Sequence, residues 1–249
     1  MPFVVEAFIN ILMTRRRWIA DEFSGNHAAL VGAHADHLSR VLRARIGEEF
    51  DITTSAGVRR GRIIHIDEGR VEFELGQEIP TTPTPNVTLA LSIFKFDRME
   101  WAIEKCTELG VARIVPLISH RTEAHLAAAA PKRVERWQRI ARQASEQSRR
   151  VSPPEICQPL KLKEAVGLSG SMRILLAESE RKIMLREVLQ SVAPGGNVVL
   201  AAGPEGGWTE TELELFGEAG WVPASLGDAI LRAETAVIAA MAVLMSELQ

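Results

Sequence analysis

Two glycine-containing turns near the C-terminus hold the residues most able to do chemistry. One is Gly203-Pro204-Glu205-Gly206-Gly207, and the other is the stretch LGDAILRAETA at 226–236. Each follows an apolar run that predicts a buried strand, and each leads into a predicted helix. Glycine lets a backbone approach a ligand closely, and helix N-termini offer unpaired N–H donors. Because open α/β sheets bind ligands at the carboxyl ends of their strands, the two turns predict one shared pocket.

The usual signatures of phosphate and metal binding do not occur in the sequence. Neither G-x-G-x-x-G nor G-x-x-x-x-G-K-[ST] is found, which argues against a metabolic enzyme with a Rossmann fold. His27, His34 and His37 lie close together, but no cysteine or paired carboxylate completes a zinc site, so we expect no metal. Cys106 and Cys157 are too few for a disulfide framework, and a reducing cytoplasm is the simplest expectation.

Composition leaves the partner open. The chain has 249 residues, 46% apolar and 24% charged, which is typical of a soluble globular protein with room for two domains. The net charge of −3 gives no global support for a nucleic-acid partner. Arginines nevertheless cluster within 15–17, 40–45 and 59–62. These clusters predict either a local basic face for RNA or a solvated surface that neighbouring acids balance.

The apolar N-terminal stretch, residues 1–13, is too short to span a bilayer, and we expect no membrane association. Met13 looks more like a natural beginning than Met1, so we predict that residues 1–12 are an upstream extension. Residues 15–79 then read as short β segments, with a hairpin alternation in 60–75 and a short helix at 35–46. These features predict a small closed or half-open β-barrel at 13–76, followed by a proline- and threonine-rich linker at 77–86.

From Val87 onward, strands alternate with helices, which predicts an α/β domain with a parallel sheet over 87–249. Strands are expected at 87–94, 111–118, 172–177, 198–202 and 221–226. We expect helices from the N-cap Asp97 to Gly110, over 131–148, after the N-cap Thr209 with Glu212, and over 234–248. The last of these is apolar nearly all round, which predicts either a subunit interface or burial within the chain.

In their order and spacing, the motifs resemble the RsmE-type methyltransferases of the SPOUT class, which methylate N3 of a uridine in bacterial small-subunit (16S) rRNA. The likeness runs from about residue 15 to residue 248. The two turns are its strongest elements, the first with Glu212 downstream. It is supported by His37 with Val41-Leu42-Arg43, by Lys105 within EKCTELG at 104–110, and by Glu146-Gln147 with Arg150 and Pro154.

The resemblance implies a PUA-like RNA-binding β-barrel followed by a SPOUT α/β domain with a deep trefoil knot. It implies S-adenosylmethionine bound within the knot, small-subunit rRNA or the assembled 30S subunit as partner, and a homodimer that completes the RNA site. Three departures from the family pattern are Arg149, the pair Asp228-Ala229, and the sequence before Met13. The first two could alter RNA contacts.

Roles for individual residues follow from the resemblance and from the chemistry of uridine. Arg232 is the first choice to act on the target uridine or its phosphate, the alternative being a salt bridge to Glu234 or Glu205. Glu205 and Glu234 are candidates to accept the N3 proton or to hold the loop, and we expect at least one to be structural. The expected cofactor-binding residues are Ala177, Glu178, Leu200, Gly203, Pro204, Glu205, Gly206, Leu226, Gly227, Ile230, Leu231, Thr235 and Ala236. The expected RNA-binding residues are Arg15, Arg17, Arg40, Arg43 and Arg150.

Two alternatives remain at this point. One is a related SPOUT enzyme that acts on another RNA, such as a tRNA. The other is a non-catalytic RNA-binding assembly factor that retains the fold. The placement of the barrel before the α/β domain favours the rRNA enzyme over the first, and the intact glycine turns with Arg232 argue against the second.

Overall fold

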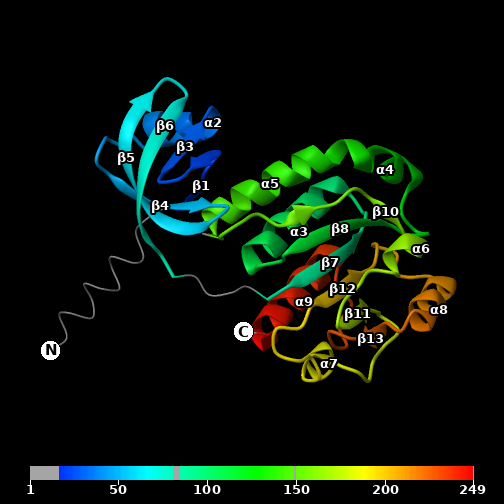
Figure 1. Cartoon of the computed structure of the whole chain (residues 1–249). Helices are drawn as coiled ribbons and strands as arrows, with labels where there is room; N and C mark the ends of the chain where they lie inside the picture. The colour runs from blue at the N-terminus through cyan, green and yellow to red at the C-terminus, as the bar shows by residue number, and fades with distance from the viewer. Residues whose placement is uncertain (1–16, 81–84, 149, 249) are drawn as a thin grey trace. The chain divides into compact units, whose positions relative to one another are not determined.

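The chain forms two compact units in the computed structural model, which describes residues 17–80, 85–148 and 150–248 (Figure 1). The first unit contains the chain up to residue 82 together with residues 145–152, and the second contains 83–144 and 153–249. Sequence analysis assigned 145–152 to the second domain, so this segment groups differently from the expected boundary. The extension expected at 1–12 lies outside the described residues.

A curled six-stranded sheet builds the first unit (Figure 1). The strand order is β1-β4-β5-β6-β3-β2, and all pairs are antiparallel except β1 with β4. The predicted hairpin is confirmed, because β5 and β6 pair across the turn at 68–69. β6 continues through residues 77–78, which sequence analysis assigned to the linker. The strands are β1 (Arg17–Ile19), β2 (Glu22–Ser24), β3 (His27–Val31), β4 (Glu49–Thr54), β5 (Gly57–Asp67) and β6 (Arg70–Glu78).

The helix expected at 35–46 is wrong in length. The chain forms only α2 (Ala33–Asp36) and a π-helical turn, η1 (His37–Val41). Arg43 then has a φ of 54°, in the left-handed region that non-glycine residues rarely adopt, and helical geometry ends before it. Leu38 of η1 is fully buried with Leu30, Ile63 and Phe73, so the turn packs on the core of the curled sheet.

Gly61 on β5 gives a test of how tightly that core is packed. A Cβ placed on Gly61 would lie 2.4 Å from Ile52 Cγ1 and 3.3 Å from Phe73 Cβ, and both side chains are fully buried. We expect Gly61→Ala to lower the free energy of unfolding by about 1–3 kcal/mol through overpacking, as measured by urea titration. Gly76→Ala on β6 is the control, since its Cβ would meet only Arg60 O at 3.5 Å. Equal losses in the two variants would contradict the prediction.

The second unit is a parallel sheet in the order β10-β8-β7-β12-β11-β13, with β9 also pairing with β8. The five predicted strands are confirmed to within two residues at each end. The short β9 and β10, which follow one another along the same edge of β8, were not predicted. The strands are β7 (Val87–Ser92), β8 (Arg113–Ile118), β9 (Glu155–Ile156), β10 (Leu160–Lys161), β11 (Met172–Leu176), β12 (Val198–Ala202) and β13 (Val222–Ala224).

Helices cover both faces of this sheet, which explains why its strands are continuously apolar. In β12, Val198 and Leu200 belong to the core shared with α3, α5, α7 and α9, whereas Val199 belongs to the core shared with α6 and α8. The helices are α3 (Phe96–Leu109), α4 (Ala124–Ala129), the 3₁₀ turn η2 (Ala130–Arg133), α5 (Val134–Gln147), α6 (Leu162–Ala165), α7 (Leu185–Leu189), α8 (Glu210–Glu218) and α9 (Ala233–Leu248).

The prediction that Asp97 caps α3 is wrong. The helix begins at Phe96, its N-cap is Lys95, and no side chain caps it. Glu100 does not close a capping box but binds Arg136 of α5 through two hydrogen bonds of 2.7 and 2.8 Å. The predicted end is confirmed, since Gly110 is the left-handed C-cap with a φ of 112°. The capping box of Thr209 and Glu212 at α8 is also confirmed.

One face of the last helix, α9, is buried within its own unit. Val237, Ala240, Met241 and Leu244 are fully buried against the sheet and α3, while Ala242 is exposed. In Figure 1, α9 lies beside α3 on one face of the sheet. No helix among the described residues is both long and apolar enough to cross a membrane.

A pocket at the carboxyl ends of three parallel strands

A cavity of about 250 Å³ lies where β11, β12 and β13 end. Its walls come from three loops that follow these strands and from the start of α9. Both glycine-containing turns contribute, so the shared pocket predicted from their positions is present. The lining residues are Arg121, Leu176, Ala177, Glu178, Ser179, Ala202, Gly203, Pro204, Glu205, Gly206, Gly207, Trp208, Leu213, Ala224, Ser225, Leu226, Gly227, Ala229, Leu231, Ala233 and Ala236.

Gly203 is where the first turn needs a glycine. A Cβ at this position would lie 3.2 Å from Cε2 and Nε1 of Trp208. The indole has little room to give way, because Trp208 Nε1 donates a 2.8 Å hydrogen bond to Leu176 O at the end of β11. Its ring also packs edge-on against Phe216, with centroids 5.0 Å apart. Trp208 therefore ties the β12 loop to β11 and sets the close approach at Gly203.

A further loop, the one after β8, also reaches the pocket. Arg121 lines it and donates a hydrogen bond from Nη1 to the carbonyl oxygen of Gly206. One residue earlier, His120 N donates a 2.7 Å bond to the carboxylate of Glu212. Glu212 is buried and also accepts from Thr209 N at 2.8 Å. The carboxylate that caps α8 thus fixes the loop that presents Arg121.

The start of the second turn is held by the side chain of the residue that precedes it, Ser225. Gly227 has a φ of 113°, a conformation that L-residues rarely adopt, and its N–H donates a 3.1 Å bond to Ser225 Oγ. Ser225 is anchored in turn, because its N–H donates to Ile183 O and its carbonyl accepts from Leu185 N. The turn at 225–227 is therefore joined to the segment before α7.

Most of the expected cofactor-binding residues lie in this pocket, and three do not. Leu200 is fully buried in the middle of β12, with its side chain in the core beneath α3 and α9. Ile230 is 89% exposed, and Thr235 is exposed on α9. Ala229, one of the departures from the family pattern, does line the pocket.

Two of the three expected catalytic residues, Glu205 and Glu234, meet at an arginine that sequence analysis missed. Arg98, in the first turn of α3, binds the Glu205 carboxylate through Nη1, and its Nε lies 3.8 Å from Glu234 Oε1. Glu205 lines the pocket, whereas Glu234 is 4% exposed and does not. Arg232 is exposed, and the structure shows no ion pair between it and any described residue. The alternative of a salt bridge from Arg232 to Glu205 or Glu234 is thus not what the structure shows.

The expected RNA-binding arginines differ in their surroundings. Arg40 is exposed and pairs with Asp36 at 3.3 Å and Glu68 at 3.0 Å. Arg43 is exposed and has no ion pair among the described residues. Burial lowers the pKa of the Arg150 guanidinium to about 10, so Arg150 is not the fully solvated helix end that was the alternative. Arg17 lies in β1, paired with Asp51 in the sheet register, and Arg15 lies outside the described residues.

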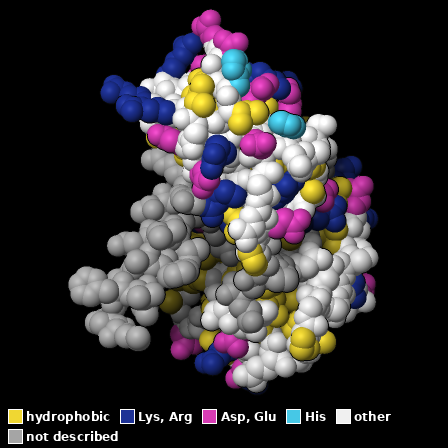
Figure 2. All heavy atoms as spheres, turned by 60° about the vertical axis from the view of Figure 1, so that its left-hand side comes forward, with side chains coloured by type: hydrophobic (Ala, Val, Ile, Leu, Met, Phe, Trp, Pro, Cys, Tyr) yellow, Lys and Arg dark blue, Asp and Glu magenta, His cyan; other side chains and the backbone are white. Residues whose placement is uncertain are grey.

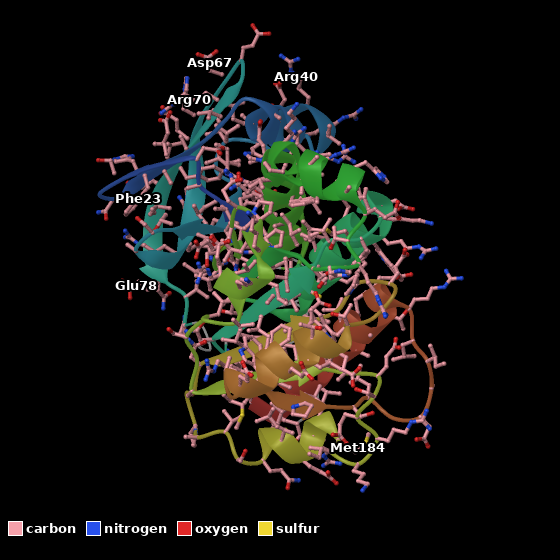
Figure 3. The ribbon with its side chains drawn as sticks, turned by 90° about the vertical axis from the view of Figure 1, so that its right-hand side faces the viewer. Phe23, Arg40, Asp67, Arg70, Glu78 and Met184 are labelled. Atoms are coloured by element: carbon pink, nitrogen blue, oxygen red, sulfur yellow. The ribbon has the colours of Figure 1, made fainter. Side chains whose placement is uncertain are left out.

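Charge is mixed over this unit. Figure 2 shows Lys and Arg side chains interspersed with Asp and Glu side chains over the upper part of the molecule. Figure 3 places Arg40 at the same end of the unit as Asp67, next to the β5–β6 turn. No group of three or more His, Cys, Asp and Glu side chains in the described part of the chain could hold a metal ion.

Sequence comparisons relate this chain to known RNA methyltransferases. A family model described as an RNA methyltransferase domain matches residues 81–245. The ribosomal RNA small subunit methyltransferase E of Synechocystis sp. is 36% identical over 218 residues, covering 86% of this chain and 71% of that protein. The protein of the same name from Aquifex aeolicus is 30% identical over 239 residues, covering 91% and 97%. This chain belongs to the ribosomal RNA small subunit methyltransferase E family.

Solved structures place the fold in the same family. The Neisseria gonorrhoeae ribosomal RNA small subunit methyltransferase E, bound to S-adenosyl methionine, superposes with a TM-score of 0.81 at 32% identity. The superposition covers 93% of this chain and 97% of the Neisseria gonorrhoeae chain. A Legionella pneumophila putative methyltransferase in complex with the bound cofactor SAM gives 0.80 at 29% identity, with 93% and 96% covered. The α/β fold with a PUA-like curled sheet and a SPOUT domain is therefore confirmed.

Proposed function

We propose that this chain transfers a methyl group from S-adenosylmethionine to N3 of a uridine in small-subunit (16S) ribosomal RNA. The observation that carries the proposal is the pocket at the ends of β11, β12 and β13, built by both glycine-containing turns. The family gives the substrate class, and the relatives crystallised with the cofactor give its identity.

The chemistry of the pocket fits this cofactor. S-adenosylmethionine joins an adenine nucleoside to a cationic sulfonium amino acid. Its adenine needs apolar walls, its ribose hydroxyls need hydrogen-bond acceptors, and its sulfonium favours nearby negative charge. Leu176, Leu226 and Leu231 supply apolar walls. The carboxylates of Glu178 and Glu205 can accept hydrogen bonds from ribose hydroxyls and complement a positive charge. At Gly203, Trp208 leaves little room for a Cβ, so this wall of the pocket is formed by backbone atoms.

The protein's task is to orient uridine N3 and to stabilise the charge that develops there. When bound, S-adenosylmethionine supplies a methyl group that its sulfonium already activates. N3 carries a weakly acidic imide proton, and when that proton leaves, negative charge spreads onto the two flanking carbonyl oxygens. A guanidinium stabilises such charge where the bound substrate displaces water from around it. We assign this role to Arg232, which lies between the pocket residues Leu231 and Ala233 and has no ion pair within the described chain.

Of the two carboxylates, Glu205 is our candidate to accept the N3 proton. It lines the pocket and is partly exposed, whereas Glu234 is buried outside the lining. A general base has to come within hydrogen-bond reach of the proton it removes. Glu234 is therefore assigned a structural role.

We further propose that the first unit holds the RNA through its phosphates. Arg43 is the strongest candidate, because its guanidinium is exposed and no described residue pairs with it, while Arg40 is already balanced by two carboxylates. Phosphate contacts of this kind position an RNA without reading its sequence. A substrate in ribosomal RNA would place the protein in the cytoplasm, with the free rRNA or the assembled 30S subunit as partner.

Two further parts of the expectation stay proposals. The first is a homodimer that completes the RNA site. It is supported by α9, where no charged residue occurs from Thr235 to Ser246 and where Ala242 is exposed. Light scattering of the purified protein measures this, and a monomer at micromolar concentration would contradict it. The second is the deep trefoil knot, which the family fold implies.

Nucleoside analysis of small-subunit rRNA from cells lacking the protein tests the function. We expect 3-methyluridine to disappear from 16S rRNA and to return when the wild-type gene is supplied, but not the Arg232→Ala gene. Persistence of 3-methyluridine would overturn the proposal. Loss of a methylated nucleoside from tRNA instead would favour a tRNA substrate. If calorimetry detects no binding of S-adenosylmethionine, a non-catalytic assembly factor is favoured.

A further inference from the structure

Arg98 connects two carboxylates that lie in different motifs. It comes from the first turn of α3, more than 100 residues before Glu205 and Glu234 in the sequence. Nη1 of Arg98 binds Glu205, and Nε lies 3.8 Å from Glu234 Oε1. Glu205 belongs to the turn after β12, and Glu234 belongs to the first turn of α9. One guanidinium therefore joins the first glycine-containing turn to the helix that follows the second.

The two carboxylates differ in burial, which gives them different roles toward Arg98. The side chain of Glu234 is 5% exposed, and its Oε2 is buried with no hydrogen-bond partner among the described residues. A buried carboxylate needs a counter-charge, and in the described part of the chain Arg98 is the cation that lies near it. The helix N-terminus of α9 adds a favourable field for the same carboxylate. Glu234 is thus a buried charge partner for Arg98.

Glu205 is held from the other side of the same guanidinium. Its side chain is 32% exposed and lines the pocket, so without a partner it would be free to rotate into solvent. Arg98 is equally exposed, at 32%, and the buried Glu234 gives it a second charge partner at 3.8 Å. Arg98 therefore links the exposed Glu205 to the buried Glu234.

We propose that Arg98 is a positioning residue that fixes the Glu205 carboxylate and its turn over the cofactor pocket. This inference rests on the proposed function for its catalytic meaning, but the ordering of the turn is a property of the chain alone. Arg98 does not line the pocket, so it would act on the reaction through Glu205. A planar guanidinium can serve two carboxylates at once, which a lysine ammonium on a flexible stem does less well.

Hydrogen exchange of the cofactor-free protein tests this directly. In Arg98→Met, we expect the Gly207 amide, which donates a 2.9 Å bond to Pro204 O within the turn, to exchange about tenfold faster, the effect of losing one charged hydrogen bond. Arg98→Lys should bring the exchange rate back to within about threefold of wild type, because the charge is retained. Arg136→Met is the matched control, since it removes an arginine bound to Glu100 by 2.7 and 2.8 Å bonds elsewhere in the same unit.

A double variant keeps the test valid if Arg98→Met destabilises the fold. Arg98→Met/Glu234→Gln removes the buried charge together with its partner, so we expect folding to recover while the Gly207 amide still exchanges fast. Calorimetry should give a Kd for S-adenosylmethionine about tenfold higher in both variants. Exchange rates and Kd equal to those of Arg136→Met would overturn the inference. If the wild-type protein orders its turn through Arg98 yet methylates no rRNA, the proposed function fails and this inference stands.

Discussion

Arg232→Ala is expected to lose most methyl transfer while binding S-adenosylmethionine as well as the wild-type protein does. The guanidinium is exposed, has no ion pair among the described residues, and stands between two residues that line the pocket. A guanidinium without such contacts is available to a substrate and is not needed by the fold. Removing one stabiliser of developing negative charge lowers kcat by about 10²–10³-fold in comparable sites.

The measurement is single-turnover methylation of small-subunit rRNA, paired with calorimetry of the cofactor. Arg139→Ala on α5 is the control, because Arg139 is also exposed, also lacks an ion pair in the described chain, and does not line the pocket. Arg232→Lys should recover only part of the rate, because the planar fork of donors is lost. A parallel loss of cofactor affinity and rate would show that Arg232 belongs to the cofactor site instead.

Gly203→Val is expected to produce the opposite pattern, a protein that folds but binds the cofactor poorly. A Cβ at residue 203 already lies 3.2 Å from the Trp208 ring, and valine adds two methyl groups there. Trp208 cannot move aside without breaking its bond to Leu176 O and its contact with Phe216. The turn must shift instead, at a cost of about 1–3 kcal/mol. Where this cost opposes cofactor binding, it corresponds to a Kd for S-adenosylmethionine that is roughly 5- to 160-fold higher.

Gly217→Val on α8 is the comparison for this variant. A Cβ at Gly217 would have no heavy atom within 4 Å, and the residue is exposed, so the substitution changes a glycine without crowding any neighbour. Calorimetry on both variants, with thermal unfolding to confirm that each is folded, gives the result. Unchanged cofactor affinity in Gly203→Val would mean that the turn does not contact the cofactor.

The pocket could be predicted from sequence because its walls are local. Each wall is a short loop after an apolar strand, and strands of this kind are recognised by their continuous apolar runs. Which side a strand residue faces is less accessible from sequence when both faces are covered. Leu200 was expected at the cofactor but belongs to the core beneath α3 and α9. Its neighbours Val199 and Ala201 belong to the core on the opposite face of the sheet. No polar residue in β12 distinguishes the two faces in the sequence.

Arg98 and Arg121 show where sequence reasoning ended. Both contact the first glycine-containing turn, but they come from elements that precede it by 107 and 85 residues. Nothing in their local sequence tells which carboxylate or carbonyl they will meet. A signal existed in retrospect: each follows the carboxyl end of a central strand, β7 or β8, at the same edge of the sheet as the turns. Similarly, the helix expected at 35–46 was too long because Arg43 leaves helical geometry, which its side chain does not announce.

Glu212 has a consequence for redesign of this enzyme family. Its one carboxylate holds the start of α8 and the backbone of His120 together, across 92 residues of sequence. Adding or deleting a residue between 207 and 212 would pull on both attachments, so this stretch has a fixed length. An affinity tag or a fluorescent reporter therefore has to be placed outside this stretch.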